Sequence, residues 1–177
     1  MQVRRSRAIF VRRAPGSAAQ ARIGLGHGVK PAALGRGGIR TLKREGDGGT
    51  PAGRFAVRQV FYRADRLSRP RTLLPLRAIR SDDGWCDEPA DRNYNRLVRL
   101  SPRSAADRLK REDHLYDLVL VLGYNDRPRA KGRGSAIFIH LARPGYAPTA
   151  GCIALSCHDL LMLLRQVRPR TEIVVLL

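Results

Sequence analysis

The segment of residues 134–156, GSAIFIHLARPGYAPTAGCIALS, limits the fold more than any other part of the chain. It begins with an apolar run that predicts a strand, continues through a loop rich in proline and glycine, and ends in Thr-Ala-Gly-Cys and a short apolar run. His140 lies in the predicted strand, twelve residues before Cys152. This length allows the strand to end and the chain to turn back, so the two side chains can meet.

The pair of His140 and Cys152 is a candidate for nucleophilic catalysis. A cysteine nucleophile needs a base within hydrogen-bond reach and backbone donors that hold an oxyanion. Gly151 precedes the cysteine, and a glycine lets a substrate carbonyl approach the main chain. We therefore expect the backbone at Gly151 to contribute to an oxyanion hole. Taken alone, His140 would be interpreted as a hydrogen-bonded core residue, but the Thr-Ala-Gly-Cys that follows favours catalysis.

The alternation in the predicted strand places Ile137, Ile139 and Leu141 on one face, and Phe138 and His140 on the other. Further strands are expected at residues 7–11 as an edge strand, twice within 21–38 around a turn, and at 54–63, 115–125 and 171–177.

In the strand at residues 54–63, Phe55, Val57 and Phe61 are expected to share a face. One helix is predicted from Ser101 to about residue 111, because Ser-Pro is a typical helix start. A second is predicted after Ser156, where Asp159 completes a capping box and a leucine stripe follows.

Strands therefore dominate, with two or three short helices and no regular βαβ alternation, which disfavours a parallel doubly wound sheet. The expected fold is a β-sandwich or a partly closed barrel. A chain of 177 residues predicts one domain, residues 1–177. Its basic residues 1–20 are expected to form an edge strand or to be flexible.

The formal net charge of +19 concerns partners rather than fold. It suits a nucleic acid, an anionic membrane or another anionic cell-envelope surface, while the scattered arginines equally suit a solvated exterior. No transmembrane span is present, and the apolar part of the N-terminus is too short for an ordinary signal peptide. Three cysteines are an odd number, so disulfides are not expected to organise the fold.

An acidic segment at residues 81–89, SDDGWCDEP, stands out in so basic a chain. Asp83, Asp87 and Trp85 could bind a cationic group of a substrate, or the carboxylates could neutralise neighbouring arginines. Cys86, Asp87 and His140 lack the spacing of a metal site, and none is predicted.

These motifs resemble the L,D-transpeptidase catalytic domain, the YkuD-like family of peptidoglycan enzymes. The resemblance runs from about residue 21 to the end of the chain. In the catalytic motif, the matching residues are His140, Thr149, Gly151, Cys152 and Ile153. In an upstream Thr-Pro-x-Gly-x-Phe element, they are Thr50, Pro51, Gly53 and Phe55.

Two positions depart from the family pattern. Ala150 stands where the common motif has histidine, and Ala154 stands where it has an arginine that helps to hold substrate. The resemblance still assigns Cys152 as nucleophile and His140 as base, and Arg143 is a candidate substitute for the arginine. The substrate-binding residues expected in all are Thr149, Arg143, Trp85, Asp83, Asp87 and Tyr124.

The resemblance implies that a donor stem peptide forms a thioester with Cys152, which an amine of a second stem peptide then attacks. No metal or cofactor is expected. The short chain and its acidic segment resemble a proteobacterial subgroup, which implies cross-links of an atypical 1–3 type. A periplasmic location is expected, with export through an unusual N-terminus or a start further upstream.

Three alternatives stay open on the sequence. Water could resolve the thioester, which would make the protein an L,D-carboxypeptidase or endopeptidase. A basic nucleic-acid-binding module is the alternative from another class, although no nucleic acid is expected as a partner because few aromatic residues accompany the charge. A thiol redox protein would use Cys157, but no resolving-cysteine motif accompanies Cys152.

Overall fold

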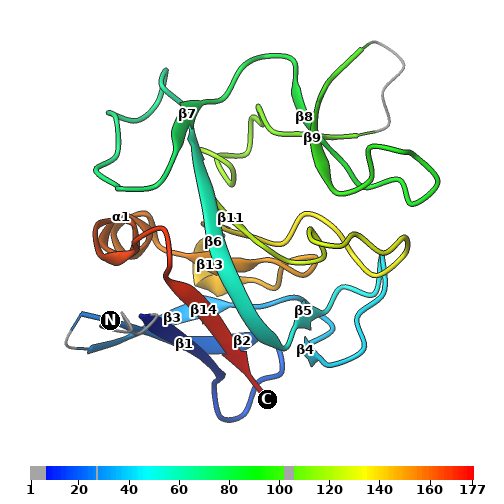
Figure 1. The fold of residues 1–177 in the computed structure, drawn as a ribbon. Coiled ribbons are helices and arrows are strands. Elements are labelled where there is room, and N and C mark those ends of the chain that lie inside the picture. Colours follow the sequence, from blue (N-terminus) through cyan, green and yellow to red (C-terminus); the bar gives the residue numbers. More distant parts are fainter. Residues whose placement is uncertain (1–6, 27, 102–105) are drawn as a thin grey trace, which may run out of the picture.

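A computed structural model describes residues 7–26, 28–101 and 106–177, and one large sheet dominates it (Figure 1). The order of its nine strands is β11-β12-β13-β3-β2-β1-β14-β6-β7, and a further pairing of β11 with β6 closes the first eight into a barrel. The strands of this sheet are β1 (Ala8–Arg13), β2 (Gln20–Leu25), β3 (Gly28–Ala33), β6 (Gly53–Tyr62), β7 (Leu76–Ala78), β11 (Leu118–Leu122), β12 (Phe138–Leu141), β13 (Ile153–Leu155) and β14 (Glu172–Leu176). The expectation of a β-rich, partly closed barrel is confirmed.

The remaining elements lie around this barrel. A three-stranded sheet has the order β10-β8-β9, with β8 at Asp83–Cys86, β9 at Arg96–Arg99 and β10 at Asp107–Arg108. A two-stranded sheet joins β4 (Ile39–Arg40) to β5 (Thr50–Pro51). Helix α1 spans Cys157–Gln166, and a 3-10 turn, η1, spans Pro144–Tyr146. In Figure 1, β8 and β9 stand above the barrel, away from β1 to β3.

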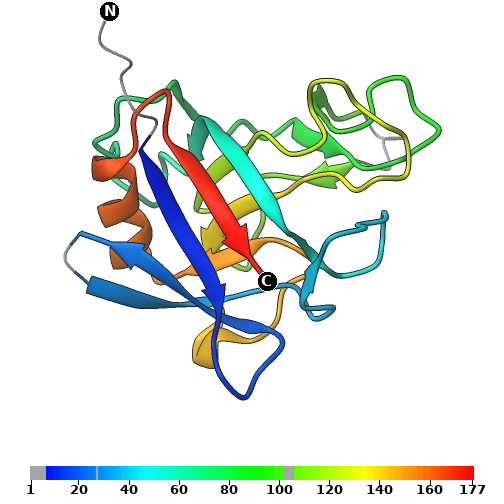
Figure 2. The same ribbon diagram turned by 60° about the horizontal axis from the view of Figure 1, so that its bottom comes forward.

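The strand expected near the N-terminus exists, but it is not an edge strand. β1 pairs in parallel with β14 on one side and antiparallel with β2 on the other, as Figure 2 shows. Ile9 and Val11 alternate into the interior and are buried. The edge assignment was wrong because the partner of β1 comes from the other end of the chain, which local patterning does not reveal.

The long strand β6 contains an irregularity that local alternation missed. Val60 pairs with Leu120, whereas Val57 pairs with Leu122, so one extra residue of β6 is accommodated between these pairs. Phe55 and Val57 accordingly face the barrel interior, while Phe61 packs on the outside. The expectation that these three residues share a face was wrong, because a bulge inverts the alternation beyond it.

The helix predicted from Ser101 to residue 111 is not present in its described part, residues 106–111; residues 102–105 lie outside the described residues. Instead, β10 pairs with β8. The Leu109 N–H donates to the Asp83 carbonyl at 3.0 Å, an ordinary hydrogen-bond distance. The buried Leu109 side chain stabilises this strand pairing, which overrides the local helix signal.

Helix α1 follows its predicted signals. The Ser156 hydroxyl accepts from the Asp159 N–H (3.1 Å) and donates to the Asp159 carboxylate (2.8 Å), which is the expected cap. The buried residues Leu160, Leu163 and Leu164 face the barrel interior. The helix ends at Gln166, shortly before Pro169.

Buried side chains form two groups, which we call the barrel core and the second cluster. The barrel core fills the barrel interior with mainly aliphatic side chains from its strands and α1. The second cluster comprises Phe61, Ile79, Trp85, Leu109, Leu115, Tyr116, Val119, Val121, Phe138 and Cys152. Strand β12 contributes to both, because Ile139 points to the barrel core and Phe138 points to the second cluster. Ile137, just before the strand, also points to the barrel core, as the alternation predicted.

Candidate active site

Cys152 and His140 line the same pocket, which has a volume of about 180 Å³ and which we call the active-site pocket. His140 lies on β12, and Cys152 directly precedes β13, which pairs with β12 in parallel. Parallel neighbours bring the cysteine loop back beside the histidine strand. Its lining also includes Asp107, Arg111, Tyr116, Arg143 and Thr149.

His140 is held in one orientation. Its Nδ1 lies 2.9 Å from the Leu141 carbonyl, and because a carbonyl only accepts, Nδ1 carries the hydrogen. The other ring nitrogen, Nε2, therefore keeps a lone pair in the neutral imidazole. The Tyr116 ring packs against the imidazole with its centroid 5.3 Å away. Burial lowers the pKa of His140 to about 4, so the ring is neutral near pH 7.

The Cys152 sulfur lies between two backbone groups. Its thiol donates to the Ala136 carbonyl (3.1 Å), and Sγ accepts from the Phe138 N–H (3.4 Å). Burial raises the pKa of the thiol to about 12, and the charge of Asp107 acts in the same direction. The resting pair is therefore a neutral thiol and a neutral imidazole rather than a thiolate and an imidazolium.

A tight turn precedes the cysteine. The Thr149 hydroxyl donates to the Cys152 carbonyl (2.6 Å) and accepts from the Gly151 N–H (3.1 Å). Among the residues that the structure describes, the Cys152 N–H has no hydrogen-bond partner, which leaves it free to face a developing oxyanion. The Gly151 N–H, which we expected in that role, is engaged by Thr149 in this structure.

Glycines allow three backbone segments to pack behind this turn. Gly151 has φ +141°, and a Cβ there would lie 2.8 Å from the Gly49 carbonyl oxygen. A Cβ on Gly35 would lie 2.1 Å from the Gly48 oxygen. The turn is also hydrogen-bonded to the residue that follows β3, because the Thr149 N–H donates to the Leu34 carbonyl (2.9 Å). The glycine-rich segments therefore serve close backbone packing under the cysteine turn.

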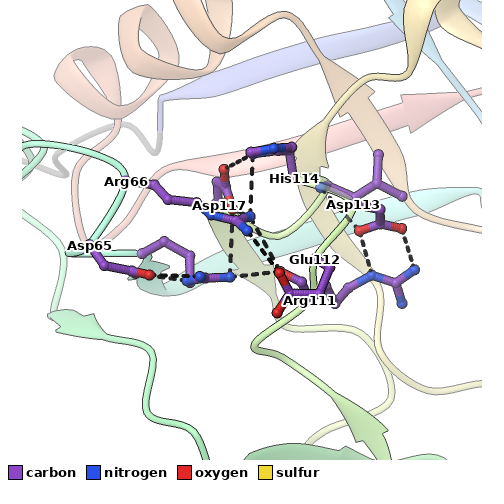
Figure 3. Close-up of polar contacts among 9 residues, drawn as sticks. Asp65, Arg66, Arg111, Glu112, Asp113, His114 and Asp117 are labelled. Carbon is purple, nitrogen blue, oxygen red and sulfur yellow. Dashed lines mark hydrogen bonds and ion pairs between the residues drawn. The ribbon is translucent and has the colours of Figure 1, made fainter.

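Three charged side chains, Asp107, Arg111 and Arg143, line the pocket, and Asp113 contacts the two arginines. We call these four residues the charged rim. Arg111 forms two hydrogen bonds with Asp113 (2.9 and 2.6 Å), which Figure 3 shows, and lies 3.5 Å from Asp107. Its guanidinium is 5.0 Å from the centre of the Tyr116 ring. Arg143 lies 3.9 Å from Asp113. Two cations and two carboxylates therefore stand beside the cysteine and histidine.

A second layer of contacts holds the segment that carries Arg111. The buried Arg63 donates to the Arg111 carbonyl (2.6 Å), and Arg66 donates to the Asp117 carboxylate (2.8 Å). Asp117 also contacts His114 at 2.7 Å (Figure 3). Hydrogen bonding to Arg111 lowers the pKa of Asp113, so the carboxylate is ionised near neutral pH. The rim is thus fixed from behind by backbone and ion-pair contacts.

The other four residues expected to bind substrate lie outside the lining of this pocket. Trp85 and Tyr124 line a separate hollow of about 370 Å³. Asp83 is buried and accepts from Arg77 (2.8 Å), which matches the alternative in which the acidic segment neutralises arginines. Asp87 is exposed at the end of β8. A substrate role for these four residues stays a prediction.

Sequence reasoning missed Asp107, Arg111 and Tyr116. Asp107 and Arg111 lie in the segment for which a helix was expected from its Ser-Pro start. Tyr116 was counted as part of a buried strand. No local signal connected these residues to Cys152, because they reach the pocket through long-range pairing of β8 with β10 and of β11 with β12.

Two further searches concern the described ranges only. Within residues 7–26, 28–101 and 106–177, no group of three or more His, Cys, Asp or Glu side chains is placed to hold a metal ion. No helix in the same ranges has the length and apolar content needed to cross a membrane. The thiols of Cys86, Cys152 and Cys157 are all free.

Comparison with known proteins gives one match. No curated protein and no solved structure matches the chain. The family model of the YkuD domain, described as the L,D-transpeptidase catalytic domain, matches residues 6–175. This range contains the barrel, the cysteine turn, the histidine strand and the charged rim. Because the match spans nearly the whole chain, the protein belongs to the YkuD family of L,D-transpeptidase catalytic domains.

Proposed function

We propose that the protein is a peptidoglycan L,D-transpeptidase that uses Cys152 as nucleophile and His140 as general base. The observation that supports this most is the shared pocket, in which a cysteine thiol and an imidazole with a free Nε2 lone pair meet beside an unpaired backbone N–H. The family acts on peptidoglycan stem peptides in general, which gives the substrate class.

The first half of the reaction acylates the enzyme. The Cys152 thiol and the His140 imidazole are both neutral at rest. The Cys152 proton therefore passes to His140 Nε2 as the sulfur attacks a carbonyl carbon of the donor stem peptide. The Cys152 N–H donates to the oxyanion that forms. When the tetrahedral intermediate collapses, the C–N bond breaks, His140 returns the proton to the leaving amine, and a thioester remains on Cys152.

The second half transfers the acyl group. An amine of an acceptor stem peptide attacks the thioester carbon, His140 accepts the amine proton, and the C–S bond breaks as the thiolate is protonated again. The new bond is an amide, and no oxidant, metal or cofactor enters the balance. If water attacks in place of the amine, the same steps give a shortened stem peptide, which is the hydrolase alternative.

The charged rim fits the proposed substrate. Diaminopimelate in a stem peptide carries an ammonium and a carboxylate on one side chain. Arg111 and Arg143 can bind a carboxylate, and Asp107 can bind an ammonium, all within the lining of the same pocket. In this assignment, arginines from other parts of the chain take the role of the family arginine whose position Ala154 occupies here. We further propose a periplasmic location, where peptidoglycan is accessible, and 1–3 cross-links.

The direct test is mass spectrometry of purified peptidoglycan fragments after incubation with wild type, Cys152→Ala and Cys157→Ala. Cys157→Ala is the matched control, because Cys157 is a free thiol that does not line the pocket. Cross-linked dimers from wild type and Cys157→Ala, but not from Cys152→Ala, would support the proposal, and fragmentation would locate the bond. Shortened monomers without dimers would identify a hydrolase. No Cys152-dependent product of either kind would refute the proposed function.

A further inference from the structure

Asn95 is a buried polar residue outside the active-site pocket whose contacts lead to the nucleophile. It directly precedes β9, has φ +55° and is 4% exposed. Its Oδ1 accepts from the Trp85 Nε1 (3.0 Å) and from the Ala136 N–H (3.0 Å). Its Nδ2 donates to the carbonyls of Tyr124 (2.9 Å) and Asn125 (2.8 Å). All the hydrogen-bonding capacity of the side-chain amide is therefore used.

Ala136 is the residue through which Asn95 reaches the site. Its φ is +51°, in the left-handed region that alanine rarely adopts, because its Cβ then approaches the following carbonyl oxygen. Such a conformation persists where the surroundings hold it. The bond from the Ala136 N–H to Asn95 supplies one such constraint. A second acts nearby, where the Gly134 N–H donates to the Tyr94 hydroxyl (3.0 Å).

The conformation of Ala136 decides what the sulfur contacts. The Ala136 carbonyl accepts the Cys152 thiol hydrogen (3.1 Å), and the Phe138 N–H donates to the same sulfur (3.4 Å). The carbonyl favours the neutral thiol, whereas the N–H favours the thiolate. Residues 136–138 therefore fix the place of Sγ and also influence its protonation.

We propose that Asn95 is a positioning residue for Cys152, which acts by holding Ala136 in its left-handed conformation. This proposal rests on the proposed function only in taking Cys152 as the nucleophile. Loss of the amide releases the Ala136 carbonyl from the thiol. The thiol then loses its acceptor and ionises more easily, while the sulfur loses its fixed place relative to the donor carbonyl.

Loss of the amide should lower turnover and raise the reactivity of the Cys152 thiol, and both changes can be measured. For Asn95→Gly, we expect turnover in the cross-linking assay to fall by about 10–100-fold with little change in KM, because small misplacements of reacting groups have effects of this size. We expect the rate of Cys152 alkylation by iodoacetamide at pH 8 to rise by about threefold or more, as a larger thiolate fraction reacts. Glycine keeps the left-handed backbone at residue 95 without strain.

The experiment uses the full chain and follows each thiol separately by mass spectrometry of the alkylated peptides. Cys86, buried in the same hairpin, is the internal reference for local opening. Asn93→Gly is the matched control, because it makes the same change two residues earlier, where the side chain has no hydrogen bond among the described residues.

A rise at Cys152 alone, together with reduced turnover, would support the positioning role. A parallel rise at Cys86, an equal rise at Cys152 in Asn93→Gly, or no change at Cys152 in Asn95→Gly would overturn it. Alkylation needs no peptidoglycan. A wild-type protein without cross-linking activity would therefore refute the proposed function, while the alkylation rates would still decide the role of Asn95.

Discussion

The barrel core and the second cluster share strands but differ in composition and in how they are built. The barrel core consists mainly of aliphatic side chains that alternate inward along the strands. The second cluster holds four aromatic residues, Phe61, Trp85, Tyr116 and Phe138, together with Cys152. The rings of Trp85 and Phe138 lie 5.0 Å apart, and those of Tyr116 and His140 lie 5.3 Å apart.

This difference indicates a division of roles along single strands. On β12, Ile139 faces the barrel core, whereas the next residue, His140, lines the active-site pocket. The inner face needs apolar volume and little specificity. On the outer face, the thiol and the imidazole need hydrogen-bonding partners, which Ala136 and the backbone of β12 supply. The charged rim comes from segments outside the barrel. Substitutions of neighbouring residues should therefore affect either stability or activity.

The largest expected effect is on activity, from His140→Gln. The proposed general base is removed, so kcat for cross-linking should fall by about 10²–10⁴-fold. The free energy of unfolding should change less than it does in Ile139→Ala. Steady-state kinetics and urea denaturation of both variants would measure this. A His140→Gln protein with near wild-type kcat would mean that another group accepts the Cys152 proton.

The neighbouring change, Ile139→Ala, should have the opposite result. Ile139 is fully buried in the barrel core, and its truncation should lower the free energy of unfolding by about 2–5 kcal/mol. Cross-linking activity per folded molecule should remain within a few-fold of wild type. A strong loss of activity in the folded variant would show that the two faces of β12 are coupled, which contradicts the division of roles.

The pKa of His140 gives a pH-dependent version of the same comparison. The ring has a pKa of about 4 in the folded protein against an ordinary value of 6.5, because burial disfavours its charge. Between these values the unfolded state binds more protons, so stability is fully present above pH 6.5 and decreases as the pH falls toward 4. The stability difference between wild type and His140→Gln should thus fall by on the order of 3 kcal/mol from pH 7 to pH 4.

Denaturation curves of wild type and His140→Gln at several pH values would check this. Both proteins contain the same titrating carboxylates, so the effect of the carboxylates cancels in the difference. A difference that stays constant over this range would mean that His140 is not buried in its neutral form. Activity should persist at pH 6 and decline only as the pH approaches 4, because the base must be unprotonated to accept the thiol hydrogen.

The barrel was predictable because its signals are local and repeated. Alternation in β12, apolar runs in β11 and β14, and the cap at Ser156 each lie within one continuous segment. The exceptions have non-local causes. The bulge in β6 is defined by pairing with β11, and β10 exists because it pairs with β8.

The site shows the same limit. That Cys152 and His140 can meet was predictable because one short segment contains both, and the two residues line the same pocket. Arg111 and Asn95 reach the same region from distant parts of the chain, and their roles depend on long-range pairing that no local pattern reports. The missed residues are therefore those that only tertiary contacts bring to the pocket.

A smaller effect is expected at the charged rim. Arg111→Ala removes a lining cation that is held by two hydrogen bonds, so KM for the donor should rise by about 10–100-fold, equivalent to about 1.4–2.8 kcal/mol. Arg143→Ala should raise KM less, because the Arg143 side chain is half exposed and its ion pair with Asp113 is long, at 3.9 Å. Arg99→Ala, which pairs with Asp82 away from the pocket, is the control. Equal KM values for all three variants would exclude the rim from donor binding.

The smallest expected effect lies in α1, which covers the barrel core. Ser156→Ala removes the hydroxyl that accepts from the Asp159 N–H, so the free energy of unfolding should fall by about 1 kcal/mol. His158→Ala changes an exposed residue in the same turn and should have a smaller effect on stability. Because α1 packs on the barrel core rather than the second cluster, neither variant should alter kcat. Reduced kcat in a stably folded Ser156→Ala protein would show that the helix start influences Cys152, and that the two regions are less independent than their packing indicates.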